Sequence, residues 1–124
     1  MKKVINSSKA PGAIGPYSQA IEANGIVFIS GQLPINAETG EMVEGAEAQA
    51  RQSLENIKHI LGEAGLTMDN IVKTTVYLSD MSYFADMNKV YASYFSGDFP
   101  ARSAFAVKEL PKQALVEIEC IAVR

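Results

Sequence analysis

The sequence is poor in residues that often carry catalytic or metal-binding chemistry. It has one cysteine, Cys120, one histidine, His59, and no tryptophan. A lone cysteine cannot form a disulfide within the chain, and a lone histidine supplies neither the ligand cluster of a zinc site nor a place for a histidine triad. Carboxylates, tyrosines, backbone groups and arginine are left as the candidate chemistry, and we expect no metal.

Long apolar runs and clusters of basic residues are also missing. No stretch approaches the roughly 20 apolar residues that a membrane-spanning helix needs. The net charge is -3 without any run of lysine or arginine, which argues against a groove for nucleic-acid phosphates. Met1 to Asn6 carry two lysines but not the apolar stretch of a secretory signal. We therefore expect a cytoplasmic protein that uses neither a membrane nor a nucleic acid as its partner.

What the sequence does have is the composition of an ordinary globular domain. Of its 124 residues, 48% are hydrophobic and 20% are charged. At this length about two-thirds of the unfolded surface can be buried, which suffices for a core without disulfides or metal. We expect one domain over residues 1–124.

Hydrophobic periodicity and turn residues predict an α+β chain in the order ββαβαββ. The Asn24-Gly25 dipeptide favours a two-residue hairpin turn between the first two strands. The predicted strands are 18–23, 26–30, 71–78, 101–107 and 115–123, the predicted helices are 46–64 and one beginning after Asp80, and Lys3–Ile5 allows a further short strand.

Each predicted helix carries a single apolar stripe. The stripes are Ala50, Leu54, Ile57, Leu61 and Ala64 in the first helix, and Phe84, Met87, Tyr91 and Tyr94 in the second. Two such helices cover one face of a sheet, whereas several strands are apolar on both faces. We expect a homo-oligomer whose sheet faces pack together, with any polar site at the seams between subunits.

Arg102 is the most informative single residue, because it lies in the apolar, strand-like run from Phe99 to Val107. A half-buried guanidinium needs an anion, and its rigid fork of donors fits a carboxylate in two-point fashion. The residue is therefore either half of an internal ion pair or a clamp for an anionic ligand.

Glu117 is the candidate acid or base. It lies in an apolar strand, where a carboxylate either pairs with a cation or has its proton affinity raised. Glu119 shares its side of the strand, and nothing in the local sequence separates the two.

Other residues have both a structural and a functional interpretation. Tyr17 follows a rigid turn and is either a packed aromatic or part of a pocket, and Ser30 and Asn88 are either capping groups or pocket groups. Cys120 is expected to fill the core, and His59 is expected to face water because it lies opposite the apolar stripe of its helix.

Six motifs, in this order along nearly the whole chain, resemble those of the Rid family, also called the YjgF-like family, of reactive intermediate deaminases. They are Ala13 to Ala20 (AIGPYSQA), Ser30 to Pro34 (SGQLP), Gln52 to Asn56 (QSLEN), Val72 to Val76 (VKTTV), Pro100 to Ser103 (PARS) and Val116 to Glu119 (VEIE). The resemblance implies the chorismate-mutase-like, ferredoxin-type fold, with two helices on one face of the sheet. It also implies a homotrimer whose sheets form a central β-barrel.

The resemblance further implies an activity and roles for residues. Family members hydrolyse 2-imino acids such as 2-iminobutanoate and 2-iminopropanoate, in equilibrium with enamines such as 2-aminoacrylate, to 2-keto acids and ammonia without a cofactor. Arg102 would bind the substrate carboxylate and Glu117 would activate water. The pocket would be lined by Tyr17, Ser30 and Asn88, with backbone groups near Gly31 and Ala104.

The chain departs from the family pattern at Ala104, where many relatives have cysteine after the Arg-Ser pair. We expect this change to remove thiol-dependent side functions and to spare deamination. Two alternatives to a deaminase stay open at this point: a non-catalytic module that binds a small carboxylate, and a ribonuclease or translation inhibitor, against which the acidic charge balance argues.

Overall fold

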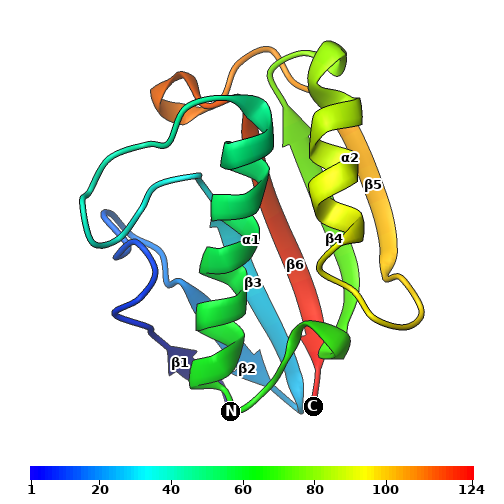
Figure 1. Cartoon of the computed structure of the whole chain (residues 1–124). Helices are drawn as coiled ribbons and strands as arrows, with labels where there is room; N and C mark the ends of the chain where they lie inside the picture. The colour runs from blue at the N-terminus through cyan, green and yellow to red at the C-terminus, as the bar shows by residue number, and fades with distance from the viewer.

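The computed structural model describes all residues, 1–124. It has two layers, with a six-stranded sheet and two helices lying side by side on one of its faces (Figure 1). The strands are β1 (Lys3–Ile5), β2 (Ala20–Ala23), β3 (Ile26–Gln32), β4 (Ile71–Leu78), β5 (Ala101–Ala106) and β6 (Val116–Val123), and the helices are α1 (Ala46–Glu63) and α2 (Phe84–Ala92). The expected α+β fold with two helices on one face is confirmed.

The sheet has the strand order β1-β2-β3-β6-β4-β5. Only β4 and β5 are parallel, and α2 forms the crossover between them; the other neighbours are antiparallel. β5 is therefore an edge strand, and β6 lies near the centre of the sheet between β3 and β4 (Figure 1).

The hairpin prediction is confirmed, and its second strand is longer than expected. Asn24 and Gly25 have φ angles of 52° and 76°, as a two-residue turn between twisted strands requires. β3 continues past Ser30 because a bulge between Ile29 and Gln32 lets Gln32 pair with Ile118 of β6. This bulge brings Gly31 against β6.

The apolar stripe of α1 forms the centre of the core, as predicted. Leu54, Ile57 and Leu61 are fully buried and pack with Val76 and Ile118 of the sheet. The helix ends as its sequence indicates, since the N–H of Leu66 donates to the carbonyl of Leu61 across Gly65, whose φ is 75°.

A short 3₁₀ turn, Met81–Tyr83, precedes α2, and the Asp80 side chain accepts from the N–H of Ser82 at 2.8 Å. The predicted cap is therefore present, one turn earlier than α2 itself. α2 ends at Ala92, so Tyr94 of the predicted stripe lies just beyond the helix. No helix in the structure combines the length and apolar character needed to cross a membrane.

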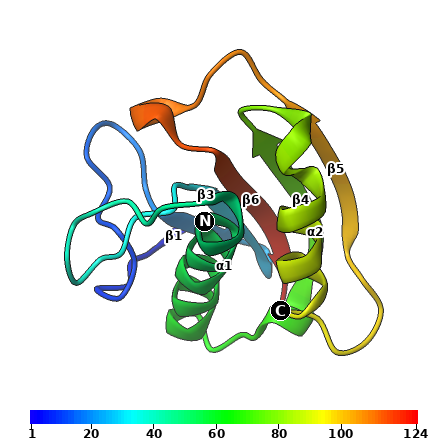
Figure 2. The same ribbon diagram turned by 45° about the horizontal axis from the view of Figure 1, so that its top comes forward.

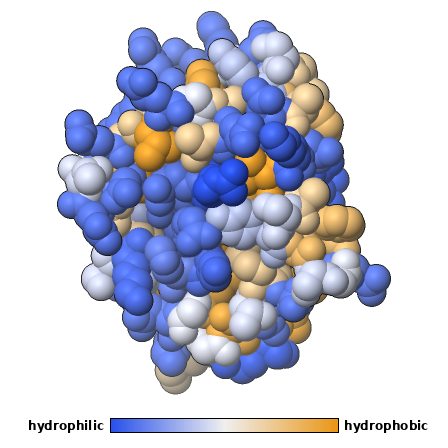
Figure 3. Space-filling model, in the orientation of Figure 1, coloured by the Kyte–Doolittle hydropathy of each residue, from blue (hydrophilic) through white to orange (hydrophobic).

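Both helices lie on the same side of the sheet in the turned view as well (Figure 2), and no helix covers the opposite face. Phe28 and Phe105 lie on that uncovered face, each 46% exposed, and Phe105 packs edge-on against Tyr77 with ring centroids 5.6 Å apart. The expected mismatch between two helices and strands apolar on both faces is therefore present in the structure. By contrast, the helix-covered face is mostly hydrophilic at its surface, with apolar area gathered toward the β5 edge (Figure 3).

One surface prediction needs correction. His59 was expected to face water, but it is half-buried and its Nδ1 lies 3.1 Å from the carbonyl oxygen of Lys9. The segment between β1 and β2 passes over this side of α1, so the helix face opposite the apolar stripe is partly covered. A pattern read along one helix does not show what a distant loop places on it.

A second buried stripe on α1 is polar, and it holds the long loop after β3. Ser53 Oγ donates to the carbonyl of Gln32 at 2.9 Å, and Asn56 Nδ2 donates to the carbonyls of Leu33 and Ile35, each at 3.1 Å. Both side chains are fully buried. They satisfy backbone carbonyls that would otherwise lie unpaired in the core, and so they fix the chain where it leaves Gly31.

We predict that Asn56→Leu destabilises the fold by about 2–3 kcal/mol, because two buried carbonyls lose their donor. Unfolding in urea, followed by circular dichroism, measures the effect. Lys58→Leu, at an exposed position on the same helix, is the control and should change stability by no more than about 0.5 kcal/mol. Equal midpoints for the two variants would contradict a structural role for this amide.

Candidate active site

Arg102 lies on β5 with its side chain against α2. Its Nη1 donates to Asn88 Oδ1 at 2.7 Å. Its Cζ lies 4.7 Å from the centre of the Tyr91 ring and 5.4 Å from that of Phe84. Because Phe84, Asn88 and Tyr91 follow one another at spacings of four and three residues, α2 offers the guanidinium two aromatic faces and one amide oxygen from a single stripe.

Arg102 has no carboxylate partner. Every ion pair in the chain is formed by Arg51, Lys89 or Arg124. The internal ion pair that the sequence left open therefore finds no partner within this chain. A half-buried guanidinium with a single hydrogen bond still has donors free for an anion supplied from outside.

Glu117 lies on β6, on the face of the sheet that the helices leave uncovered. Its neighbours Val116 and Ile118 are fully buried on the helix side, whereas Glu117 is half-buried and forms no ion pair. Burial, aided by the nearby charge of Glu119, raises the pKa of the Glu117 carboxyl. The arrangement favours a carboxylate that can accept a proton closer to neutral pH than an ordinary glutamate does.

Gly31 lies directly against the side chain of Glu117. A Cβ at this position would collide with Glu117 Oε2 and would stand only 3.0 Å from Glu117 Cδ. The bulge in β3 thus brings backbone of the Ser30-Gly31 segment directly against the carboxylate, and a larger residue at position 31 would have to displace the carboxylate from this position.

The structure gives Glu117 and Glu119 different neighbours, a distinction that could not be made from the sequence. Glu119 lies opposite Thr75 and lines a cavity of about 170 Å³ with Phe28, Lys73 and Cys120, away from Gly31. Cys120 itself is 3% exposed, and burial raises the pKa of its thiol to about 12. It is a core residue, as expected.

Tyr17 and Ser30 line a common cavity of about 410 Å³ at the other end of β3 from the hairpin turn. Ser30 Oγ donates to the carbonyl of Ser18 at 2.6 Å, which ties the segment before β2 to the end of β3. The Tyr17 side chain is 53% exposed, so it is not the packed aromatic of the structural alternative. Tyr17 and Ser30 line this cavity, and Gly31, the next residue after Ser30, contacts Glu117. We call these four residues the acid half-site.

Arg102, Asn88, Phe84 and Tyr91 form a second group, the arginine half-site. Ala104, two residues after Arg102 on β5, is half-buried and packs against the core on the same side. The arginine half-site lies on the helix side of the sheet, and the acid half-site lies on the uncovered side. β4 separates β5 from β6, so the two strands are also about 10 Å apart. One chain cannot bring Arg102 and Glu117 to the same small molecule.

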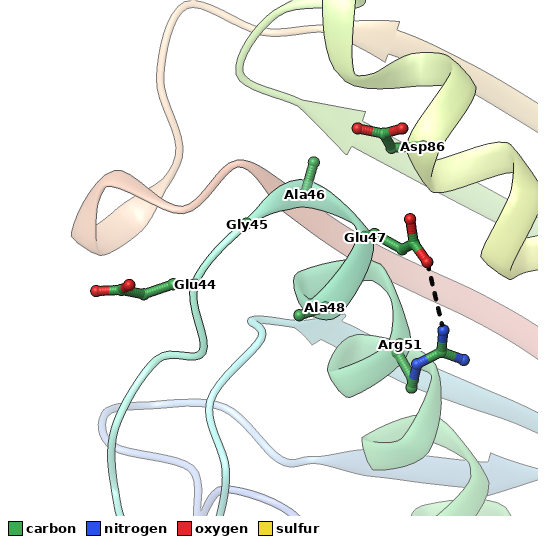
Figure 4. Close-up of a pocket in the computed structure, with 7 residues that line it drawn as sticks. All are labelled: Glu44, Gly45, Ala46, Glu47, Ala48, Arg51 and Asp86. Carbon is green, nitrogen blue, oxygen red and sulfur yellow. Dashed lines mark ion pairs between the residues drawn. The ribbon is translucent and has the colours of Figure 1, made fainter.

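The sequence did not signal a further cavity of about 410 Å³, which lies where α1 begins (Figure 4). Glu44, Glu47, Arg51 and Asp86 line it, and Glu47 Oε1 lies 3.8 Å from Arg51 Nη2. None of the predicted site residues is among them, and the only ion pair among the four side chains is that of Glu47 with Arg51. No group of three or more histidine, cysteine or carboxylate residues is arranged to hold a metal ion.

From the sequence, Phe84 and Tyr91 were expected to be core residues, and their contact with the Arg102 guanidinium was not predicted. Their spacing with Asn88 was visible, but only the position of β5 against α2 shows that this stripe faces the guanidinium.

Comparison with known proteins identifies the family of this chain. The family model described as Endoribonuclease L-PSP matches residues 7–124. A RutC family protein of Pyrococcus horikoshii is 55% identical over 123 residues, which cover 98% of each chain. A 2-iminobutanoate/2-iminopropanoate deaminase of Salmonella typhimurium is 48% identical over 127 residues, covering 100% of this chain and 99% of that one.

Among solved structures, that of E. coli TdcF with bound serine superposes with a TM-score of 0.95 at 46% identity, covering 98% of both chains. Identity and coverage at this level leave the family in no doubt. This chain belongs to the Endoribonuclease L-PSP family, the family of the Rid (YjgF-like) proteins.

Proposed function

We propose that this protein hydrolyses 2-imino acids, among them 2-iminobutanoate and 2-iminopropanoate, to 2-keto acids and ammonia. One observation carries the proposal: Arg102 is a half-buried guanidinium, oriented by an amide and two rings, with no carboxylate in its own chain. The carboxylate of a small organic acid would supply the anion that this guanidinium lacks. The relatives that are named as deaminases of such acids, at 46–48% identity over the full chain, support the same activity.

The complete site, in this proposal, forms between two copies of the chain. The arginine half-site of one copy faces the acid half-site of the next, since the two half-sites lie on opposite faces of one sheet. The uncovered face, with Phe28 and Phe105 exposed, supplies the apolar surface for this association. A closed ring of three copies, the homotrimer with a central barrel, repeats the same contact at every seam.

The chemistry needs no cofactor. The substrate carboxylate binds Arg102 in two-point fashion, which leaves its protonated imine carbon, already electrophilic, beside Glu117 of the neighbouring copy. The ionised Glu117 accepts a proton from water as the oxygen attacks that carbon, giving a carbinolamine. Return of this proton to nitrogen turns the amino group into a leaving group. The C–N bond then breaks as the carbonyl forms, while Glu117 takes the hydroxyl proton and passes it to the departing ammonia, so water and iminium become keto acid and ammonium.

Glu117 favours an enzyme over a module that only binds. A carboxylate with a raised pKa, placed against a glycine and free of any cation, is suited to proton transfer and adds nothing to the binding of an anion. The ribonuclease named in the family description fits less well. The net charge of -3 and the small cavities do not match a phosphate backbone.

The proposal also covers the domain organisation, the cellular location and the partners of the protein. Residues 1–124 act as one domain around the single apolar cluster that joins the sheet to both helices. The protein works in the cytoplasm, with a buried free thiol at Cys120, and its partners are its imino-acid substrates and further copies of itself.

We predict that both named residues are needed for activity. A pyridoxal-phosphate-dependent threonine dehydratase supplies the imine, and the release of 2-oxobutanoate is followed with and without the protein. Glu117→Gln should lower kcat about 100-fold or more. Arg102→Ala should chiefly raise KM, because the substrate loses its charge-assisted bonds.

The matched controls are Glu109→Gln and Arg51→Ala, at exposed positions, which should keep the full rate. A wild-type protein that does not speed keto-acid release contradicts the deaminase. Full activity in Glu117→Gln, with binding intact, contradicts its role as the base.

We predict that the two impaired variants restore each other when they are assayed at a substrate concentration well below the KM of Arg102→Ala. When Arg102→Ala and Glu117→Gln are mixed and allowed to exchange subunits, about a quarter of the seams receive both intact half-sites, since each half is intact with a chance of about one half. The mixture should therefore regain about a quarter of wild-type activity. Activity that stays at the level of the separate variants would show that each site lies within one chain.

We predict that the pH profile follows Glu117. Its raised pKa means that kcat/KM falls on acidification at a higher pH than an ordinary glutamate would give, because the protonated carboxyl cannot act as base. Glu119→Gln removes a like charge and should move this acid limb to lower pH. The limb should stay above the ordinary glutamate range, since burial is the larger cause. A limb unmoved by Glu119→Gln and lying in the ordinary range would contradict the assignment.

A further inference from the structure

Tyr91 is the residue in the structure that links the arginine half-site to the centre of the sheet. Its side chain is 3% exposed, and its hydroxyl lies 2.7 Å from Thr74 Oγ1, which is fully buried. The ring of the same residue lies 4.7 Å below Arg102 Cζ. One side chain therefore contacts both the proposed ligand clamp and a buried strand.

The register of β4 and β5 places the two residues that Tyr91 contacts next to each other. Thr74 of β4 is the lateral partner of Arg102 of β5 in the parallel pair. Both side chains project to the helix side, where Tyr91 of α2 meets them. Tyr91 thus contacts the guanidinium through its ring and the threonine through its hydroxyl, while the pairing of β4 with β5 sets Thr74 and Arg102 side by side. None of these relations depends on an exposed loop.

The Arg102 side chain needs several contacts to hold its guanidinium in one orientation. An arginine side chain has several rotatable bonds, and ordering it costs up to about 2 kcal/mol. Asn88 fixes one end of the guanidinium through Nη1, but a single hydrogen bond allows the plane to swing about it. The aromatic faces of Tyr91 and Phe84 restrict this tilt, and of the two only Tyr91 is itself tied by a hydrogen bond.

We propose that Tyr91, held by Thr74, is a positioning residue that sets the plane of the Arg102 guanidinium for a carboxylate ligand. The tyrosine does not touch the ligand and acts only through Arg102. The identity of the ligand rests on the proposed function, whereas the fixed plane of Arg102 does not.

Two measurements on the full-length protein test the proposal. The first is the dissociation constant of 2-oxobutanoate, the product acid, from isothermal titration. The second is the ¹⁵N order parameter of the Arg102 Nε–H group in the ligand-free protein, which reports the mobility of the guanidinium directly. The variants are Tyr91→Leu, which removes the aromatic face, and Tyr91→Phe and Thr74→Val, which remove the hydroxyl contact.

We expect Tyr91→Leu to weaken binding of 2-oxobutanoate about 10-fold, as loss of a partly buried cation–π contact implies. Tyr91→Phe and Thr74→Val should weaken it about 3-fold to 5-fold, and all three should lower the order parameter of Arg102. Thr74→Ser keeps the hydroxyl and should restore both values to those of the wild type.

The matched control is Tyr94→Phe. Tyr94 also loses a hydroxyl bond in this change, since its OH donates to Glu55 Oε2 at 2.6 Å, but this bond lies away from Arg102. It should leave the order parameter and the binding constant unchanged.

The outcomes separate this proposal from the proposed function. If the wild type does not bind 2-oxobutanoate but the order parameter falls in the Tyr91 and Thr74 variants, the function fails and the positioning role stands. If the folded variants keep a rigid Arg102, or lose no more than Tyr94→Phe does, the positioning role is wrong even where the deaminase is active.

Discussion

The positive charge of Arg102 has no counter-charge in its own chain, and the organisation of the site follows from that fact. The guanidinium is half-buried between α2 and β5, where Asn88 orients it and two rings lie against it. None of these neighbours neutralises it. A buried charge without an ionic partner is costly, and the structure keeps it in place through directional contacts that leave donors free. A small carboxylate is the ligand that such a group accepts best.

The second constraint is that the sheet has only one covered face. The β4-α2-β5 crossover and α1 place both helices on the same side, so residues that alternate along a strand have different surroundings. Arg102 points to the helices, and Glu117 points away from them. In the proposed function, the uncovered face of one copy meets the edge of another, so that Glu117 and Arg102 from two copies act on one ligand. The position of both helices on one side of the sheet leaves the opposite face with exposed apolar residues and places the two side chains on different faces.

Precision in the acid half-site comes from packing inside the chain. The bulge in β3 brings Gly31 against Glu117, and the polar stripe of α1 holds the chain just after it through Ser53 and Asn56. The carboxylate is thereby partly withdrawn from water, which raises its pKa. Glu119, two residues further along the same face, lies beside Phe28, Lys73 and Thr75 and not beside Gly31. Two residues of the same type on one strand face therefore have different neighbours.

The sequence alone determined the order of the elements, the hairpin at Asn24-Gly25, the apolar stripe of α1 and the presence of one arginine out of place in an apolar strand. These features are local, because periodicity and turn chemistry act over a few residues. Only the tertiary structure decided that Arg102 has no carboxylate partner, that Tyr91 and Phe84 stack on it, that Glu117 rather than Glu119 meets Gly31, and that His59 lies under the segment that contains Lys9. Each of these depends on which distant segments come together, and strand order and sheet face are not encoded in the spacing of residues along any single element.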